Sequence, residues 1–563
     1  DKEEGYGRLF NVFAMGDCGG FEGENGGVVF DDLEGVLGYY LKEKRGRVKG
    51  IPTTVNYYLL TGGEINYESY QRRLDTLVDG YCSGTKINAE EVKAKIQVNV
   101  FNEATLSSQD LTEKRKACLE RRGLGAFAAD SAPDVNGAYR IAVLGFGKTG
   151  QYAMEELYTH SAHLTSEKGE NGVAYLPVRF IADVYDVTSD EKSGLFAYNH
   201  PLFRCIYGKD GAPLSTEEIV GRADKVGGQA FNALYGACAR LGKKDEKSAA
   251  KFVEENMRFP VAVFHPQSCF AFPLMDCDRT DAMVKATKEN NIRDIVVALG
   301  DDERNIAMAN VVIDSFKRAF YADGACGCHV KIYVNLIERE SVKRLDWQCG
   351  DEDIFSTPCK DGDGKAVQPY LSVIPFGCRN DMFSYATLID DYSARLYSHG
   401  YDLIDQDENK AADFIGRLDD DYNAFRGNTD VSDGWRNLGQ FKRKSNRSAQ
   451  NFAVNYYEYY LLHGGKLTEE ELAYLGRLEH ERWNRFHISH GWIYGYYDRN
   501  DKPYKEMRRS MRHHDCLCAY DVMLSESTKK YDMINVRLGF IKEIVYGGNQ
   551  DKKESRTDGG VND

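Results

Sequence analysis

Short apolar runs alternate with longer amphipathic segments through much of the chain. Before residue 130, three runs are typical of buried strands and three segments have helical spacing: 9–15, 53–60 and 96–101 for the strands, 30–44, 67–81 and 111–122 for the helices. Strands that alternate with helices of about 10 to 15 residues indicate a parallel sheet with crossover helices. The pattern therefore predicts an N-terminal α/β, Rossmann-like unit over residues 1–130.

A glycine pattern follows the next predicted strand, where the run at 139–150 ends in Gly-x-Gly-x-x-Gly and leads into a helical segment. In such a turn the first glycine permits the tight bend, the second lets the backbone approach a pyrophosphate, and the third lets the helix pack against the strand. The helix N-terminus then faces the anion. We therefore expect a nucleotide or dinucleotide to bind at Gly145, Gly147, Lys148, Thr149 and Gly150. The alternative is a Rossmann scaffold that has lost its ligand.

An acidic residue at the end of the next strand, 178–186, would complete such a site by accepting hydrogen bonds from a ribose. Asp183 and Asp186 are the candidates. Both lie more than 30 residues beyond Gly150, where about 20 is usual. The connection before this strand is therefore expected to be long.

Two further strand–helix pairs follow at 293–316 and 329–345, and 371–377 is a candidate final strand. The segments GFGKTG, ALGDDERN and KIYVNLIERES occur in the order found in TrkA-N (RCK) domains, and residues 131–404 resemble that family. The resemblance implies a Rossmann-like sheet that binds NAD(H) or another adenine nucleotide, with Asp302 and Asn305 near the ligand. A polar insertion at about 187–258 departs from the family pattern. The two strand–helix arrays are either tandem units or halves of one large sheet.

Composition narrows the possible functions of this 563-residue chain. A net charge of −15 argues against a broad nucleic-acid surface, because phosphate binding needs a basic footprint. No apolar run approaches the roughly 18 to 20 residues that span a bilayer, so a membrane role would require a separate channel partner. The 14 cysteines are scattered and lack Cys-x-x-Cys. We therefore expect a reduced, cytoplasmic protein without a metal site.

The densest aromatic segment lies near the C-terminus, at 478–532. A helical stripe stops at Gly491, and alternating aromatics follow at once. The order Glu-Arg-Trp, Gly-Trp-x-Tyr-Gly, a basic loop and Tyr-Asp resembles the ryanodine-receptor repeat (RyR) domain. We place a mainly α RyR-like domain at 405–550 and a disordered tail at 551–563.

The RyR-like segment offers aromatic and basic candidates for a second ligand. Trp483 is expected in the core, whereas Arg482 either clamps a phosphate or pairs with a glutamate at the surface. The basic cluster at 508–514 either captures an anion or pairs with nearby acids. The residues favoured for ligand binding are Arg482, Trp492, Tyr494, Arg508, Arg512 and His514. The histidines and cysteines at 513–518 are adjacent in sequence, and such neighbours seldom enclose one metal ion.

No nucleophile elbow, Walker loop or paired-carboxylate pattern is present, so no sequence pattern supports catalysis. The resemblances imply a nucleotide-sensing regulatory or effector protein, of a kind associated with antiviral defence, that forms a homo-oligomer. One alternative is the cytoplasmic gating subunit of a potassium channel or transporter. A second alternative is an enzyme that processes NAD or ADP-ribose.

Overall fold

The structure is a computed structural model, and the chain divides into two compact units, one formed by residues 1–106 and 427–444 and the other by 107–426 and 445–563. The residues that it describes are 9–14, 54–60, 67–84, 88–93, 96–133, 137–169, 172–208, 214–225, 257–266, 292–323, 329–345, 359–360, 366–367, 370–383, 391–426, 428, 431, 434–435, 438–495, 500–522 and 526–546. The helix predicted at 30–44 and the tail at 551–563 lie outside these residues.

The N-terminal unit contains a three-stranded parallel sheet, in the order β1 (Leu9–Ala14), β2 (Thr54–Leu60), β3 (Ile96–Phe101). Helices α2 (Tyr67–Cys82) and α3 (Ala89–Lys93) connect β2 to β3. The three predicted strands and the helix at 67–81 are confirmed. Among the described residues this sheet is separate from the larger one, so the two arrays are tandem units.

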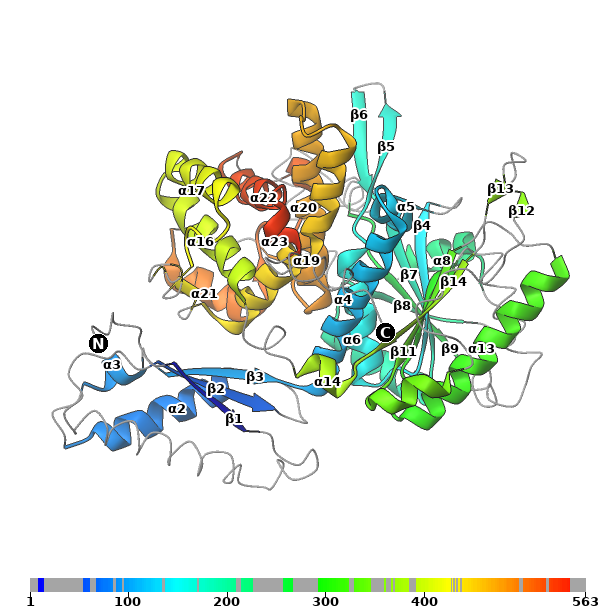
Figure 1. The fold of residues 1–563 in the computed structure, drawn as a ribbon, viewed down its shortest axis with the longest axis horizontal. Coiled ribbons are helices and arrows are strands. Elements are labelled where there is room, and N and C mark those ends of the chain that lie inside the picture. The colour runs from blue at the N-terminus through cyan, green and yellow to red at the C-terminus, as the bar shows by residue number, and fades with distance from the viewer. Residues whose placement is uncertain are drawn as a thin grey trace, which may run out of the picture. The chain divides into compact units, whose positions relative to one another are not determined.

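The larger unit is built on a seven-stranded sheet in which every strand pair is parallel (Figure 1). Its order is β14 (Tyr370–Phe376), β11 (His329–Asn335), β10 (Ile292–Val297), β4 (Ala138–Leu144), β7 (Arg179–Tyr185), β9 (Val261–His265), β8 (Arg204–Tyr207). With β4 as the first strand, this is the doubly wound Rossmann order with one extra edge strand, β8. The strands are apolar runs because both faces of the sheet are covered, and all seven residues of β4 are buried.

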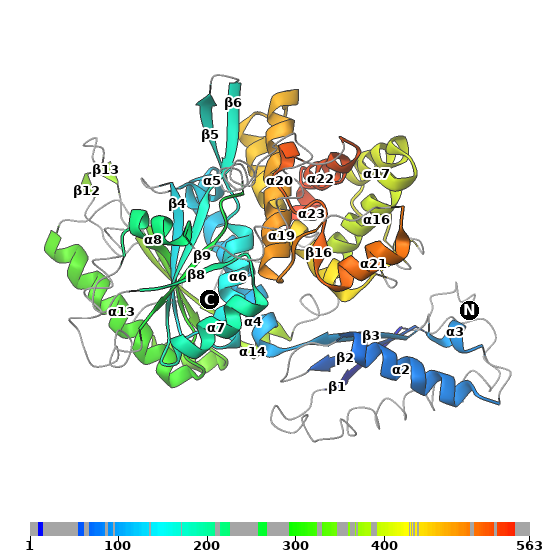
Figure 2. The ribbon, with the colours of Figure 1, turned by 180° about the vertical axis from the view of Figure 1, so that it is seen from behind.

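Helices cover the two faces of this sheet (Figures 1 and 2). One face packs against α4 (Glu103–Arg122), α6 (Lys148–His160) and α7 (Ser189–Asn199), and the other packs against α13 (Asp302–Asp323). Shorter elements complete the unit: α5 (Ala126–Ser131), α8 (Thr216–Ala223), η1 (Arg339–Arg344), α14 (Arg379–Met382) and the pair β12 (Cys359–Lys360) and β13 (Ala366–Val367). The helix that the sequence predicts after β11 is the 3-10 helix η1.

The long connection before β7 and the insertion after it both form regular structure. The connection is α6 followed by an antiparallel hairpin, β5 (Leu164–Gly169) and β6 (Gly172–Pro177). The insertion, expected to be a polar excursion, supplies α7, the edge strand β8 and α8 within its described residues. Its first half therefore belongs to the sheet.

The C-terminal region is mainly helical, as predicted. Its elements are α16 (Tyr392–Gln406), α17 (Glu408–Asp420), α19 (Gln440–Leu462), α20 (Glu469–Ser489), β15 (Ile493–Tyr494), α21 (Lys502–Ser510), β16 (His513–His514), η2 (Tyr520–Val522), α22 (Glu526–Leu538) and α23 (Lys542–Tyr546). Helix α16 packs against α17 and α22, although the boundary at 404 assigned it to the Rossmann-like domain. No helix among the described residues is both long and apolar enough to cross a membrane.

Candidate functional site

The glycine loop lies at the carboxyl end of β4, where the strand order reverses between β4 and β10. Gly145 has a φ of 91°, and a Cβ there would fall on the carbonyl oxygen of Ala298 at the end of β10. A Cβ at Gly150 would fall on the carbonyl oxygen of Gly145. The first and third glycines therefore hold strand, helix and neighbouring strand in close contact, as the motif predicts.

Gly147 differs, because no atom lies within 4 Å of the position that its Cβ would occupy. It is the N-cap of α6, with exposed Gly147 and Lys148 and half-buried Thr149 at the start of the helix. Backbone N–H groups at a helix N-terminus attract anions. Open space above this glycine is the arrangement that allows a phosphate to approach the backbone.

Phe146 fixes the loop from below. Its side chain is fully buried and meets the rings of Phe196 and Phe264 edge-on, at 5.3 and 5.4 Å between centroids. Its backbone N–H donates to Asp186 at 2.6 Å. The loop is thus held by contacts beneath it, and Gly147 faces outward.

Asp183 does not lie at this edge. It is 0% exposed within β7, where its carboxylate accepts two hydrogen bonds from Arg140, at 2.5 and 2.9 Å, and pairs with His265 at 2.9 Å. Burial alone would favour the neutral acid, but Arg140 and His265 lower the pKa of Asp183. The expectation that Asp183 contacts a ribose does not fit this placement, because its carboxylate is enclosed by partners from the neighbouring strands.

Asp186 lies where a ribose-binding acid is expected, just after β7 and beside the glycine loop. It is almost fully buried, and its oxygens accept hydrogen bonds from Phe146, from the Thr188 backbone and hydroxyl, and from Lys192 at 2.8 Å. Despite burial, Lys192 and the backbone donors lower the pKa of Asp186. Asp186 is therefore a charged anchor of the loop.

Asp302 and Asn305 lie at the same edge and connect neighbouring loops. Asp302 accepts hydrogen bonds from the backbone N–H groups of Ile337 and Glu338, at 2.8 and 3.1 Å. Asn305, 1% exposed, accepts from Leu299 N–H and donates to the Asn335 carbonyl. Both side chains brace the β10 and β11 loops around the switch point, so the structure unites every predicted residue of this site except Asp183.

Arg482 lies in the interior of the helical region. It and Glu479 are both 0% exposed and form a two-pronged ion pair, each hydrogen bond measuring 2.7 Å. The Tyr456 hydroxyl and Asn535 amide also donate to Glu479, and Arg482 donates to Ser448. Arg482 therefore pairs with a glutamate, as one of the two alternatives expects, but in the interior and not at the surface. Its burial does not fit the other alternative, a phosphate clamp.

Trp483 and Trp492 pack at the margin of the core that α20 shares with the sheet. Both are partly buried, and they surround His487 with His514 on the third side. Trp483 lies 3.8 Å from His487 and 4.8 Å from His514 between ring centroids, and Trp492 lies 5.4 Å from His487. Burial holds the pKa of His487 well below its usual range. We name these four residues the aromatic cluster; Trp483, expected in the core, belongs to it.

The other residues predicted to bind a ligand in the C-terminal region occupy different environments. Tyr494, at 1% exposure, packs in the core that α20 shares with the sheet. Arg508 is half-buried on α21, and exposed Arg512 has a φ of 57° and donates to the His490 carbonyl. Of these residues, Trp492 and His514 lie together, with ring centroids 6.2 Å apart, whereas Tyr494 is in the core and Arg508 and Arg512 are on or just after α21.

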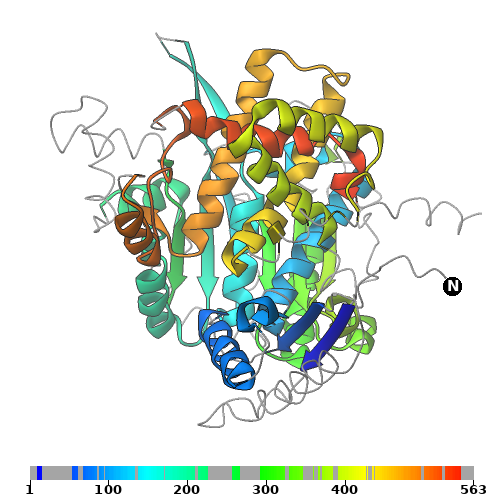
Figure 3. The same cartoon turned by 90° about the vertical axis from the view of Figure 1, so that its left-hand side faces the viewer.

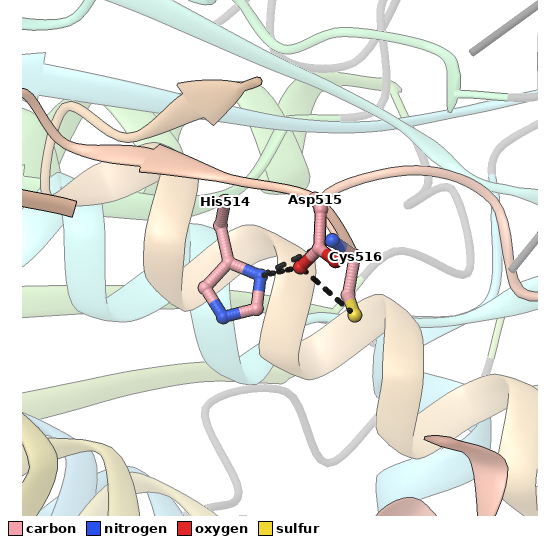
Figure 4. Close-up of side chains that lie close together, drawn as sticks. All are labelled: His514, Asp515 and Cys516. Carbon is pink, nitrogen blue, oxygen red and sulfur yellow. Dashed lines mark hydrogen bonds and ion pairs between the residues drawn. The ribbon is translucent and has the colours of Figure 1, made fainter. Parts of the chain in front are cut away.

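Three potential metal ligands are adjacent in sequence, His514, Asp515 and Cys516, with ligand atoms all within 4.8 Å of one another (Figure 4). The His514 Nδ1 accepts a hydrogen bond from the Cys516 N–H at 3.1 Å, and the Cys516 thiol lies 3.6 Å from Asp515. The imidazole nitrogen that faces the other two groups is thus already used by the backbone. These contacts describe a tight turn whose side chains already bond to one another.

Sequence reasoning missed the junction between α20 and α6. Arg485 of α20, 1% exposed, donates to the carbonyls of Tyr158 at 3.1 Å and Val178 at 2.7 Å, and to the Ser161 hydroxyl at 3.3 Å. Glu481 balances its charge at 2.7 Å. Arg485 thereby caps the C-terminus of the helix whose N-terminus carries the glycine loop. Only its place four residues after Glu481 could have indicated a paired arginine.

Comparison of the chain with protein-family models, curated proteins and solved structures found no match.

Proposed function

We propose that this protein binds an adenine nucleotide, such as NAD(H), at the glycine loop, and acts as a cytoplasmic nucleotide sensor or effector. The observation that carries the proposal is Gly147: it is open and exposed at the α6 N-terminus, at the switch point of a Rossmann-ordered sheet. In open α/β sheets ligands bind at this place. The side chains of Asp186, Asp302 and Asn305 are already engaged, so backbone N–H groups at the start of α6 would supply most of the phosphate contacts.

The test is calorimetric titration with NAD+, NADH, ADP and ATP. Gly147→Asp fits the open space, suits an N-cap and places a carboxylate where the phosphate would lie, so we expect it to abolish binding without loss of stability. Gly221→Asp is the matched control, because Gly221 is also open, on α8. Equal affinities for Gly147→Asp and the unaltered protein would reject this site.

We further propose that the aromatic cluster recognises a nucleotide-derived signal, with Trp483 and Trp492 stacking on the base. Partial exposure of both rings beside a neutral His487 supports this role. Direct packing of α20 on α6 offers a route by which one site reports on the other. A role in antiviral defence rests on the resemblance to RyR-domain proteins alone.

Native mass spectrometry of protein purified from its host would give the mass of a retained ligand. Turnover of NAD+ or ADP-ribose by the purified protein would instead favour an enzyme. Co-purification of a membrane channel subunit would favour the gating alternative.

A further inference from the structure

Helix α21 has its polar and apolar sides reversed relative to an ordinary surface helix. It has no buried residue, and among the described elements it packs mainly against β16. The half-buried side, toward its own domain, carries Lys505, Arg508 and Arg509. The side toward solvent carries Tyr504, Met507 and the C-cap Met511, with exposures of 39, 48 and 56%.

This outward stripe is the kind of surface that a partner covers. Residues 504, 507 and 511 are spaced at i, i+3 and i+7, so they form one continuous face of the helix. Half-buried Arg508, four residues after Tyr504, lies at one edge of that face, and exposed Arg512 follows the C-cap and donates to the His490 carbonyl. Methionine is adaptable at binding surfaces, and the basic edge selects an acidic partner.

Helix α17 of the same chain presents a complementary surface. Its inward face is Ala411, Phe414 and Leu418. Its exposed face has two small residues, Ala412 and Gly416, at its centre. Exposed acids surround them: Glu408, Asp413, Asp419 and Asp420. No atom lies within 4 Å of a Cβ placed at Gly416, so the space above these small residues is open. An apolar stripe could rest there while its basic edge meets carboxylates.

Both helices lie on the side of the helical region that faces away from the seven-stranded sheet, α17 and α21 at separate places (Figures 1 and 2). Figure 3 looks onto this side, with α16 and α17 in yellow-green and α21 in orange-brown. Because the two helices are apart in one copy, each is accessible to the other helix of a second copy.

We propose that α21 docks on α17 of a second copy of this chain, and α17 on the second copy's α21. A twofold dimer makes both contacts at once, since each subunit offers both surfaces. Pairing of α21 with its own copy is disfavoured, because an antiparallel pair would bring the Arg508 edges together. This interface is distinct from the glycine loop, at which we propose that the nucleotide binds.

The test is sedimentation equilibrium of the full chain. We expect a species of twice the 63.6 kDa chain mass, and a dimer that weakens as salt screens the charges. Met507→Asp places a carboxylate against the acidic face, and Asp413→Lys with Asp420→Lys makes that face basic. Each variant should raise the dissociation constant at least about tenfold, equivalent to about 1.4 kcal/mol. All these positions are exposed, so folding should be unaffected.

Mixing the two variants gives the decisive result. In the mixed dimer one contact joins the introduced carboxylate to the introduced lysines and the other is unaltered, so we expect the heterodimer to form where neither variant pairs with itself. The control is Tyr198→Asp on α7, at a tyrosine that is 84% exposed, which should leave the dimer intact. A monomeric unaltered protein, a dimer insensitive to Met507→Asp, or failure of the mixture to associate would each overturn the proposal.

Discussion

The glycine-loop edge of the sheet and the C-terminal helical region use charge in opposite ways. At the edge, carboxylates such as Asp186 and Asp302 bind backbone N–H groups and leave an open helix N-terminus at Gly147. In the helical region, Glu479 and Arg482 are fully buried against each other, and the exposed surface of the aromatic cluster is formed by rings. A charged residue within a sequence motif typical of binding sites therefore does not identify the group that contacts the ligand. At the sheet edge the accessible group is the backbone of the glycine loop, and in the helical region it is the aromatic rings.

The largest effect should come from Arg482. Arg482→Met leaves Glu479 as an uncompensated buried charge, which typically costs about 3–5 kcal/mol, so the urea midpoint should fall steeply. Arg477→Met, which breaks a surface pair with Asp521, should cost at most about 1 kcal/mol. If Arg482→Met kept full stability and only weakened nucleotide binding, the contrast between the two regions would collapse.

Two glycines of one loop should separate stability from binding. Gly145→Ala adds a Cβ onto Ala298 in a left-handed backbone and should destabilise by more than about 2 kcal/mol. Gly147→Ala meets open space at a φ of −73° and should stay within about 0.5 kcal/mol. Thermal unfolding measures both. Equal stabilities would mean that the close contact at Gly145 is not formed.

Trp492→Ala tests whether the aromatic cluster binds a nucleotide signal. Stacking of an aromatic ring on a base is worth about 1–3 kcal/mol, so affinity for a nucleotide signal should fall by roughly 5- to 150-fold. Fluorescence titration with ADP-ribose and ADP tests this. Phe486→Leu, a volume change in the buried side of α20, is the control that should alter stability and leave affinity intact.

The sequence could predict those parts of the fold whose residue patterns lie within one short segment of the chain. β4, the glycine loop and α6 are contiguous, so residues 139–160 were sufficient to place Gly145 and Gly147. Asp183 was misplaced because Arg140 and His265, which bury it, lie on neighbouring strands. Contacts between residues 43 and 82 positions apart in sequence leave no local pattern.

The helical region shows the same limit. Glu479 and Arg482 have the spacing of a surface i,i+3 pair, and the packing of α22 on α20, with donors from Tyr456 and Asn535, makes them interior. Amphipathic spacing identified the helix and Gly491 its end, with a φ of 74°. Which face turned inward was decided by helices far away in sequence.

The smallest effect concerns pH at the junction of α6, α7 and α20. Burial alone would lower the pKa of His200, but Glu155, 3.0 Å away, raises it above its ordinary value. This contribution to stability is complete below about pH 6.5 and is lost as pH rises through the raised pKa. His200→Gln should therefore reduce the pH dependence of the free energy of unfolding by about 1 kcal/mol or less. Urea unfolding between about pH 5 and 8 measures this change. An unchanged profile would remove Glu155 as the partner.

Arg485 limits where this chain can be divided, because it links the helical region to the elements that cover the sheet. Its guanidinium holds the carbonyls of Tyr158 and Val178 across the junction. A cut made ahead of α20 would remove this helix from α6, and Arg485 would lose the carbonyl groups that it binds and become exposed. The sheet and α20 therefore form one structural unit, and a recombination breakpoint between them would destabilise both parts.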